Sequence, residues 1–180
     1  YTSCINAEYL KDCMLMWVES NKKRPFFFWT HFMDVHDGVH GSGPFQLPPS
    51  SLLTVSNKEN RNRYHKDIIS NKACHYVDKQ LKDILMYLDS NDLRENTLIV
   101  ITSDHGMHNN IVKRDGEKLL HFYNECVQIP MLFYSPTISP LSINKVTSHI
   151  DLAPTILDLI GLKKEESFQG ETVRNKSGDS

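Results

Sequence analysis

Residues 98–108 read LIVITSDHGMH, and this stretch decides the fold. Its first half is apolar and rich in β-branched residues, which is typical of a strand buried on both faces. The run ends directly at Asp104, His105 and Gly106, without a polar spacer. Open α/β sheets bind their ligands beyond the carboxyl ends of their strands, so the Asp and the His are candidates for chemistry. The alternative is that Asp104 caps a following helix and that His105 is an ordinary surface residue.

The size and charge of the chain limit what it can be. Its 180 residues suffice for one domain, or part of one, with a sizeable apolar core. Twenty basic and 22 acidic residues give a formal net charge of −2, which does not indicate nucleic acid or an anionic membrane as a partner. The apolar runs are far shorter than the ~20 residues that a membrane span needs. The four cysteines are widely spaced without a Cys-x-x-Cys pattern, which argues against a zinc finger or a dense disulfide framework.

Predicted helices and strands alternate along the chain. Apolar residues at helical spacing predict helices over residues 5–20 and 64–90, and a third helix begins at Asp151 and ends at Gly161. Strands are predicted at FFFWTHF (26–32), TLIVITS (97–103) and IPMLFYS (129–135), with a further short one near 145–148. Residues 37–57, rich in Gly, Pro and Ser, are predicted to form a long loop. This order predicts an α/β fold with a mostly parallel central sheet covered by helices on both faces.

Two of these strands end in groups of ionisable residues, FFFWTHFMDVHDGVH (26–40) and LIVITSDHGMH. Carboxylate oxygens and imidazole nitrogens are suitable ligands for a divalent cation, which can stabilise an oxyanion or activate a nucleophile. Asp104 and His105 are adjacent and would face opposite sides of a regular strand. They converge on one ion only if the backbone turns there, which Gly106 permits. These residues alone leave the metal site and the helix cap as equal alternatives.

Longer stretches carry a resemblance to sulfatases of the alkaline phosphatase superfamily. TSDHG (102–106) resembles their second metal-binding motif, and RPFFFWTHFMDVHD (24–37) resembles the strand that ends in their Met/Asp-x-His loop. The long stretch 76–106 is similar to their helix, turn and strand, and FYNECVQIPMLFYSP (122–136) to the segment that follows. VTSHIDLAPTILDLIGL (146–162) and FQGETV (168–173) resemble their later helix block and the short sequence after it. The resemblance covers about residues 5–173 in the right order and implies an alkaline-phosphatase-like fold.

The resemblance also implies roles for single residues. Asp104 and His105 match metal ligands, and His36 matches the His that contacts the sulfate or phosphate group of the substrate. A basic residue, either Lys118 or His121, is expected to contact the same anion and the leaving-group oxygen. The metal is calcium by resemblance. Zinc and manganese stay open, because imidazole is a poor ligand for the hard calcium ion.

One departure from the family pattern limits the prediction. Sulfatases carry a Cys-x-Pro-x-Arg or Ser-x-Pro-x-Arg motif, whose first residue becomes the formylglycine nucleophile, and a preceding pair of Asp metal ligands. This sequence has neither. We therefore expect residues 1–165 to be the later part of a catalytic domain, with an incomplete fold, and residues 166–180 to be a polar tail or the start of a further segment. The isolated chain, without its nucleophile, is predicted to be inactive.

The resulting hypothesis is hydrolysis of a sulfate ester on a small molecule or a glycan, as part of a longer chain. A phosphodiesterase, a phosphonate hydrolase or a phosphoethanolamine transferase of the same superfamily is the first alternative. A non-catalytic sulfatase-like binding protein, or a truncated remnant, is the second. The sequence leaves the oligomeric state open, and also the compartment: a secreted, periplasmic or lysosomal protein fits the resemblance, but no signal sequence is visible.

Overall fold

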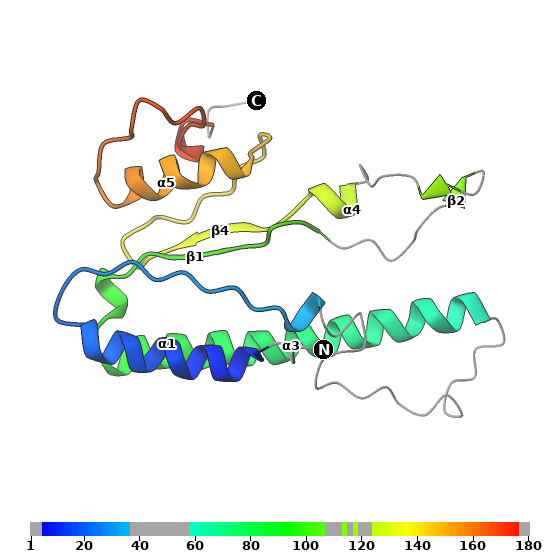
Figure 1. The fold of residues 1–180 in the computed structure, drawn as a ribbon. Helices are drawn as coiled ribbons and strands as arrows, with labels where there is room; N and C mark the ends of the chain where they lie inside the picture. The colour runs from blue at the N-terminus through cyan, green and yellow to red at the C-terminus, as the bar shows by residue number, and fades with distance from the viewer. Residues whose placement is uncertain (1–4, 37–57, 107–112, 115–116, 119–123, 177–180) are drawn as a thin grey trace. The chain divides into compact units, whose positions relative to one another are not determined.

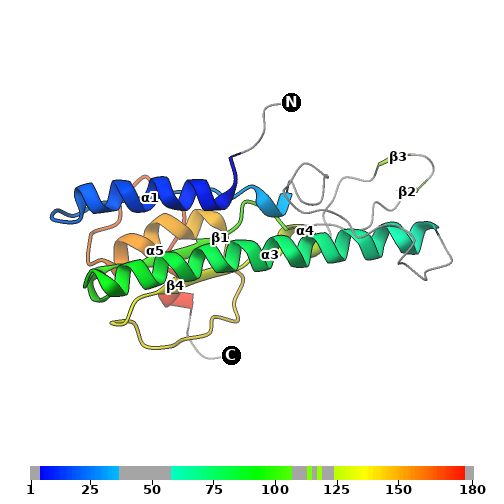
Figure 2. The same cartoon turned by 90° about the horizontal axis from the view of Figure 1, so that it is seen from below.

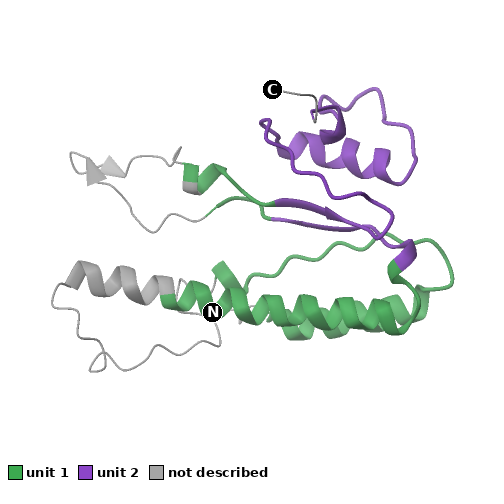
Figure 3. Cartoon of the chain, turned by 180° about the vertical axis from the view of Figure 1, so that it is seen from behind, with its two compact units in different colours: residues 1–94, 103–130 green, residues 95–102, 131–180 purple. Residues whose placement is uncertain are grey.

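The computed structural model describes residues 5–36, 58–106, 113–114, 117–118 and 124–176. The chain divides into two compact units, residues 1–94 with 103–130 and residues 95–102 with 131–180 (Figure 3). In chain order (Figure 1) the elements are α1 (Ala7–Asn21), α3 (Lys58–Ser90), η2 (Arg94–Asn96), β1 (Ile99–Thr102), β2 (Lys113–Arg114), β3 (Glu117–Lys118), α4 (Asn124–Val127), β4 (Met131–Tyr134), η3 (His149–Asp151), α5 (Leu152–Leu159) and η4 (Val173–Lys176). The helices labelled η are short 3-10 helices.

The first unit is built on α1 and α3, which lie side by side (Figures 1 and 2). Both helices are confirmed near the residues predicted for them. Their shared core holds small and aliphatic side chains: Ala7 and Val18 of α1, and Ile69, Ala73, Ile84 and Leu88 of α3. Lys11, although charged, is also buried, and its Nζ donates to Asp83 Oδ2 at 3.3 Å across the helix pair. This bond satisfies an ammonium group that burial would otherwise destabilise.

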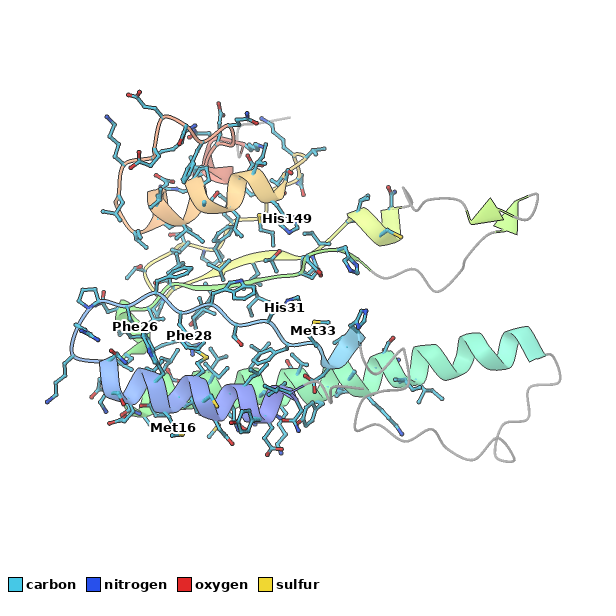
Figure 4. All side chains as sticks on the ribbon, in the orientation of Figure 1. Met16, Phe26, Phe28, His31, Met33 and His149 are labelled. Atoms are coloured by element: carbon cyan, nitrogen blue, oxygen red, sulfur yellow. The ribbon has the colours of Figure 1, made fainter. Side chains whose placement is uncertain are left out.

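The predicted strand at 26–32 is extended, but it has no sheet partner among the residues described. Its side chains alternate as in a strand. Phe26 and Phe28 contact the Trp17 ring of α1, with centroids 5.8 and 5.4 Å apart (Figure 4). Phe27 and Trp29, on the other side, are 76% and 73% exposed. The segment therefore presents a strand-like apolar face, and residues 34–36, which follow it, are helical.

In the second unit β1 and β4 pair in antiparallel fashion, with Val100 opposite Phe133 and Ile101 opposite Leu132. Both strands are where the sequence predicts them, and the mixture of helices and strands agrees with an α/β chain. The other pair among the described residues, β2 with β3, is also antiparallel. A mostly parallel sheet with helices on both faces is therefore not confirmed, because β1 has no parallel neighbour in the described part of the chain.

The short strand predicted near 145–148 is wrong, because these residues form no strand in the structure. Val146 is 91% exposed, so no apolar face is buried there. The backbone N–H of Ser148 instead donates to Asp151 Oδ2 at 2.9 Å. This bond stabilises the start of the helical residues that follow Ser148 and competes with pairing in a sheet.

The start of α5 is held by a buried carboxylate. Asp151 is 3% exposed, and its Oδ2 also accepts a hydrogen bond from Lys176 Nζ at 2.7 Å. Its Oδ1 accepts from the backbone N–H of Glu171 at 3.0 Å. The helix ends as predicted, at Gly161, whose φ of +75° favours glycine. Residues 171–176 are thereby fastened to the start of α5. Within the described residues, no helix is both long and apolar enough to span a membrane.

Candidate metal site

The backbone bends directly after β1, at Asp104 and His105. Two hydrogen bonds fix the bend: Gly106 N–H donates to the carbonyl of Cys126 at 2.7 Å, and Ser103 Oγ donates to the carbonyl of His105 at 3.1 Å. Cys126 is buried in α4, so the bend is anchored on a packed residue of the same unit. The turn that convergence of the two side chains requires is confirmed. Residues 107–112, which would form the capped helix of the alternative, lie outside the described residues.

The bend brings the two predicted metal ligands together. His105 Nε2 lies 3.6 Å from Asp104 Oδ2, and the two side chains are 66% and 62% exposed. His105 Nδ1 lies 2.7 Å from the carbonyl oxygen of Gly106, so a proton on Nδ1 is donated there, and in the neutral ring the lone pair is then on Nε2. Two ligand atoms bound to one ion at about 2.0–2.4 Å are themselves about 3–4 Å apart. The pair therefore has the spacing and the chemistry of two ligands of one divalent cation.

The charge state of Asp104 suits such a role. Partial burial raises the pKa of its carboxyl, but the backbone N–H of His105, which donates to Oδ1 at 2.9 Å, and the charge of that residue's imidazole lower it by more. His31 adds a further lowering contribution through its charge. The pKa of Asp104 consequently lies below its usual value, so the carboxylate is ionised and able to bind a cation at neutral pH.

His31 is a residue that the sequence analysis did not single out. It lies on the extended segment before residues 34–36 (Figure 4), where its ring contacts Trp29 at a centroid distance of 5.9 Å. The alternation of FFFWTHF does indicate the side of the segment on which His31 lies. It places His31 on the same side as Phe27 and Trp29, away from Phe26 and Phe28.

Of the remaining predicted site residues, only His36 has a side chain that the structure describes. His36 is exposed and is one of the described helical residues 34–36. Lys118 lies in β3, and His121 lies outside the described residues. In the part of the chain that the structure describes, no three His, Cys, Asp or Glu side chains are placed to hold a metal together. Asp104 and His105 thus account for two ligands of a candidate site.

Comparison with known proteins identifies what the chain is similar to. The family model "Sulfatase" matches residues 5–162. An arylsulfatase of Hemicentrotus pulcherrimus is 26% identical over 178 residues, covering 94% of this chain and 29% of the relative. Arylsulfatase K of Mus musculus is 30% identical over 139 residues, covering 71% of this chain and 24% of the relative.

Among solved structures, Ps i-CgsB in complex with k-i-k-neocarrahexaose matches with a TM-score of 0.60 and 25% identity. The match covers 92% of this chain and 36% of that protein. The chain thus spans about a third or less of the length of these relatives.

Proposed function

Because this chain belongs to the sulfatase family, we propose that it forms part of a metal-dependent catalytic domain that hydrolyses sulfate esters. The observation that carries the proposal is the bend after β1, which sets an ionised carboxylate and an imidazole nitrogen 3.6 Å apart. Between exposed side chains, the attraction of an Asp and a His contributes little by itself. A bound cation gives both groups a partner.

In the proposed site Asp104 and His105 hold a divalent cation, which is calcium by family resemblance, with zinc or manganese as alternatives. The cation, when bound, stabilises negative charge on the sulfate oxygens. His36 contacts the same anion through its imidazole. Lys118 or His121 supplies the positive charge that stabilises the leaving-group oxygen as the S–O bond breaks. Each of these groups acts by charge or by hydrogen bonding.

The proposed substrate is a sulfated small molecule or glycan. Two relatives are named arylsulfatases, and the matched solved structure holds an oligosaccharide, k-i-k-neocarrahexaose. These names support a sulfate ester as the reacting group and leave room for a sugar as its carrier.

We further propose that the remainder of a sulfatase domain covers the exposed side of residues 25–33 and supplies the nucleophile. Phe27 and Trp29 are apolar and largely exposed there, and the backbone of this segment pairs with no strand in the described part of the chain. An extended segment with apolar side chains on both faces is typical of an interior strand of a parallel sheet. Pairing with further strands would give the mostly parallel, alkaline-phosphatase-like sheet that the sequence predicts.

The test is the variant Asp104→Ala in the natural polypeptide at full length, assayed for bound metal and for hydrolysis of an aryl sulfate. We expect both to be lost together, because the variant removes one ligand and the local negative charge. Asp12→Ala is a matched control, since Asp12 is an Asp carboxylate of similar exposure, 60%, on α1. Retention of both metal and turnover in Asp104→Ala contradicts the proposed site.

A further inference from the structure

Asp34 is a buried carboxylate that joins two segments of the first unit. It is 3% exposed and is the first of the three described helical residues, 34–36. Its Oδ2 accepts a hydrogen bond from the backbone N–H of Ala7, 27 positions earlier, at 2.9 Å. Ala7 is the first residue of α1 and is fully buried. The bond therefore ties the residues that carry His36 to the start of α1.

The negative charge of Asp34 also affects the pKa of a residue of α3. Burial raises the pKa of Tyr76, a residue of α3, and the negative charges of Glu8 and Asp34 raise it further. Asp34 thus lies where α1, α3 and residues 34–36 meet within one unit. Burial of a carboxylate is costly unless hydrogen bonds or charges compensate it, and the N-terminus of α1 contributes the bond from Ala7 N–H to Oδ2.

We infer that Asp34 is the positioning residue for His36. By anchoring residues 34–36 to the start of α1, it fixes the position of the exposed imidazole of His36. The bond to Ala7 has a carboxyl oxygen as its acceptor at 2.9 Å, and a bond to a carboxylate is stronger than a bond between neutral groups. It acts two residues before His36, so a change at Asp34 moves the backbone from which that imidazole projects. This inference rests on the proposed function, in which His36 contacts the substrate anion.

A purely structural role for Asp34, as a second cap of α1, makes a different prediction. Asn6 offers the comparison, because its Oδ1 accepts from the backbone N–H of Tyr9 at 2.9 Å, at the same end of the same helix. Asn6→Ala removes one side-chain acceptor from the end of α1, as Asp34→Ala does, without touching residues 34–36. Loss of either acceptor is expected to lower the melting temperature.

The experiment uses the natural polypeptide at full length, with an aryl sulfate as substrate, and compares Asp34→Ala with Asn6→Ala. We expect Asp34→Ala to lower kcat/KM by about 10- to 100-fold, the effect of misplacing a binding group by about 1 Å. Asn6→Ala is expected to leave kcat/KM unchanged. Asp34→Glu keeps the charge and the acceptor but lengthens the side chain by one methylene. It should fold and still raise KM, whereas a cap role alone predicts an unchanged KM.

A second readout is independent of turnover. The imidazole resonances of His36, assigned by their loss in His36→Gln, should shift in Asp34→Ala and Asp34→Glu and stay in place in Asn6→Ala. If the unaltered protein does not hydrolyse sulfate esters, the proposed function fails. The His36 resonances then decide by themselves whether Asp34 positions His36. Unshifted resonances in both Asp34 variants overturn the inference, and so does an unchanged kcat/KM in an active enzyme.

Discussion

Replacing Asp151 by alanine should destabilise the second unit by about 3–4 kcal/mol. The carboxylate accepts from two backbone N–H groups, those of Ser148 and Glu171, and from Lys176 Nζ, at 2.9, 3.0 and 2.7 Å. Each backbone bond contributes roughly 1 kcal/mol and a charge-assisted bond roughly 1.5–2 kcal/mol. The side chain of Asp151 is 4% exposed and that of Lys176 27%, so water restores the lost partners only in part.

Amide hydrogen exchange over residues 168–176 measures this effect locally. A loss of 3 kcal/mol corresponds to about two orders of magnitude in the protection factor. Arg174→Ala is the matched control, because the pair of Arg174 with Asp158 is long, at 3.5 Å, and the Arg174 side chain is 60% exposed. Exposed pairs of this kind contribute about 0–1 kcal/mol. Equal exchange in Asp151→Ala and Arg174→Ala would show that the bonds of Asp151 do not hold residues 168–176 in place.

Protonation of the same carboxylate should lower the stability of the second unit in acid. Burial raises the pKa of Asp151, but Lys176 and the backbone N–H groups of Glu171 and Ser148 lower it by more, so the folded-state pKa lies below its usual value. The stabilisation is therefore fully present above the unfolded-state pKa of about 3.9 and is lost as the pH falls through the folded-state pKa. Below about pH 4 the protection of residues 168–176 should decline in the unaltered chain and not in Asp151→Ala.

Three further predictions concern single contacts. Burial and the hydrogen bond to Glu19 raise the pKa of Tyr87 to about 12, so Glu19→Gln should lower it in an ultraviolet titration; an unchanged tyrosinate transition contradicts this. A Cβ at Gly170 would lie 2.0 Å from the carbonyl oxygen of Ile150, so Gly170→Ala should destabilise the second unit by roughly 1–3 kcal/mol in urea, and equal stability argues against the packing. Trp29→Lys replaces an apolar ring that is 73% exposed, so self-association of the 180-residue chain, measured by sedimentation, should decrease. Unchanged self-association would show that the exposed apolar side of residues 25–33 does not mediate it.

The helix ends were predictable because their signals are local. Asp151 starts α5 and Gly161 ends it through bonds and dihedrals that involve a few neighbouring residues. The strands at 99–102 and 131–134 followed from short apolar runs for the same reason. Their antiparallel pairing did not follow, because pairing depends on which distant segment is available and not on the residues of either strand.

The candidate site was predictable in part. Asp104 and His105 stand out because charged residues directly follow an apolar strand, and Gly106 marks the turn. The contribution of His31 to the charge around Asp104 depends on a segment more than 70 positions earlier in the chain, which no local pattern reveals. Burial of Asp34 was equally hidden, since it requires the N-terminus of α1 as a partner.

The most direct test of the proposed function is sulfate release from an aryl sulfate by the natural polypeptide at full length, measured beside phosphate release from a phosphate diester. We predict that sulfate is released faster and that chelation of the divalent metal stops the reaction. Faster hydrolysis of the diester would contradict sulfatase chemistry and favour a phosphodiesterase. Binding of a sulfated glycan without release of sulfate would contradict catalysis and favour a binding protein of the same family.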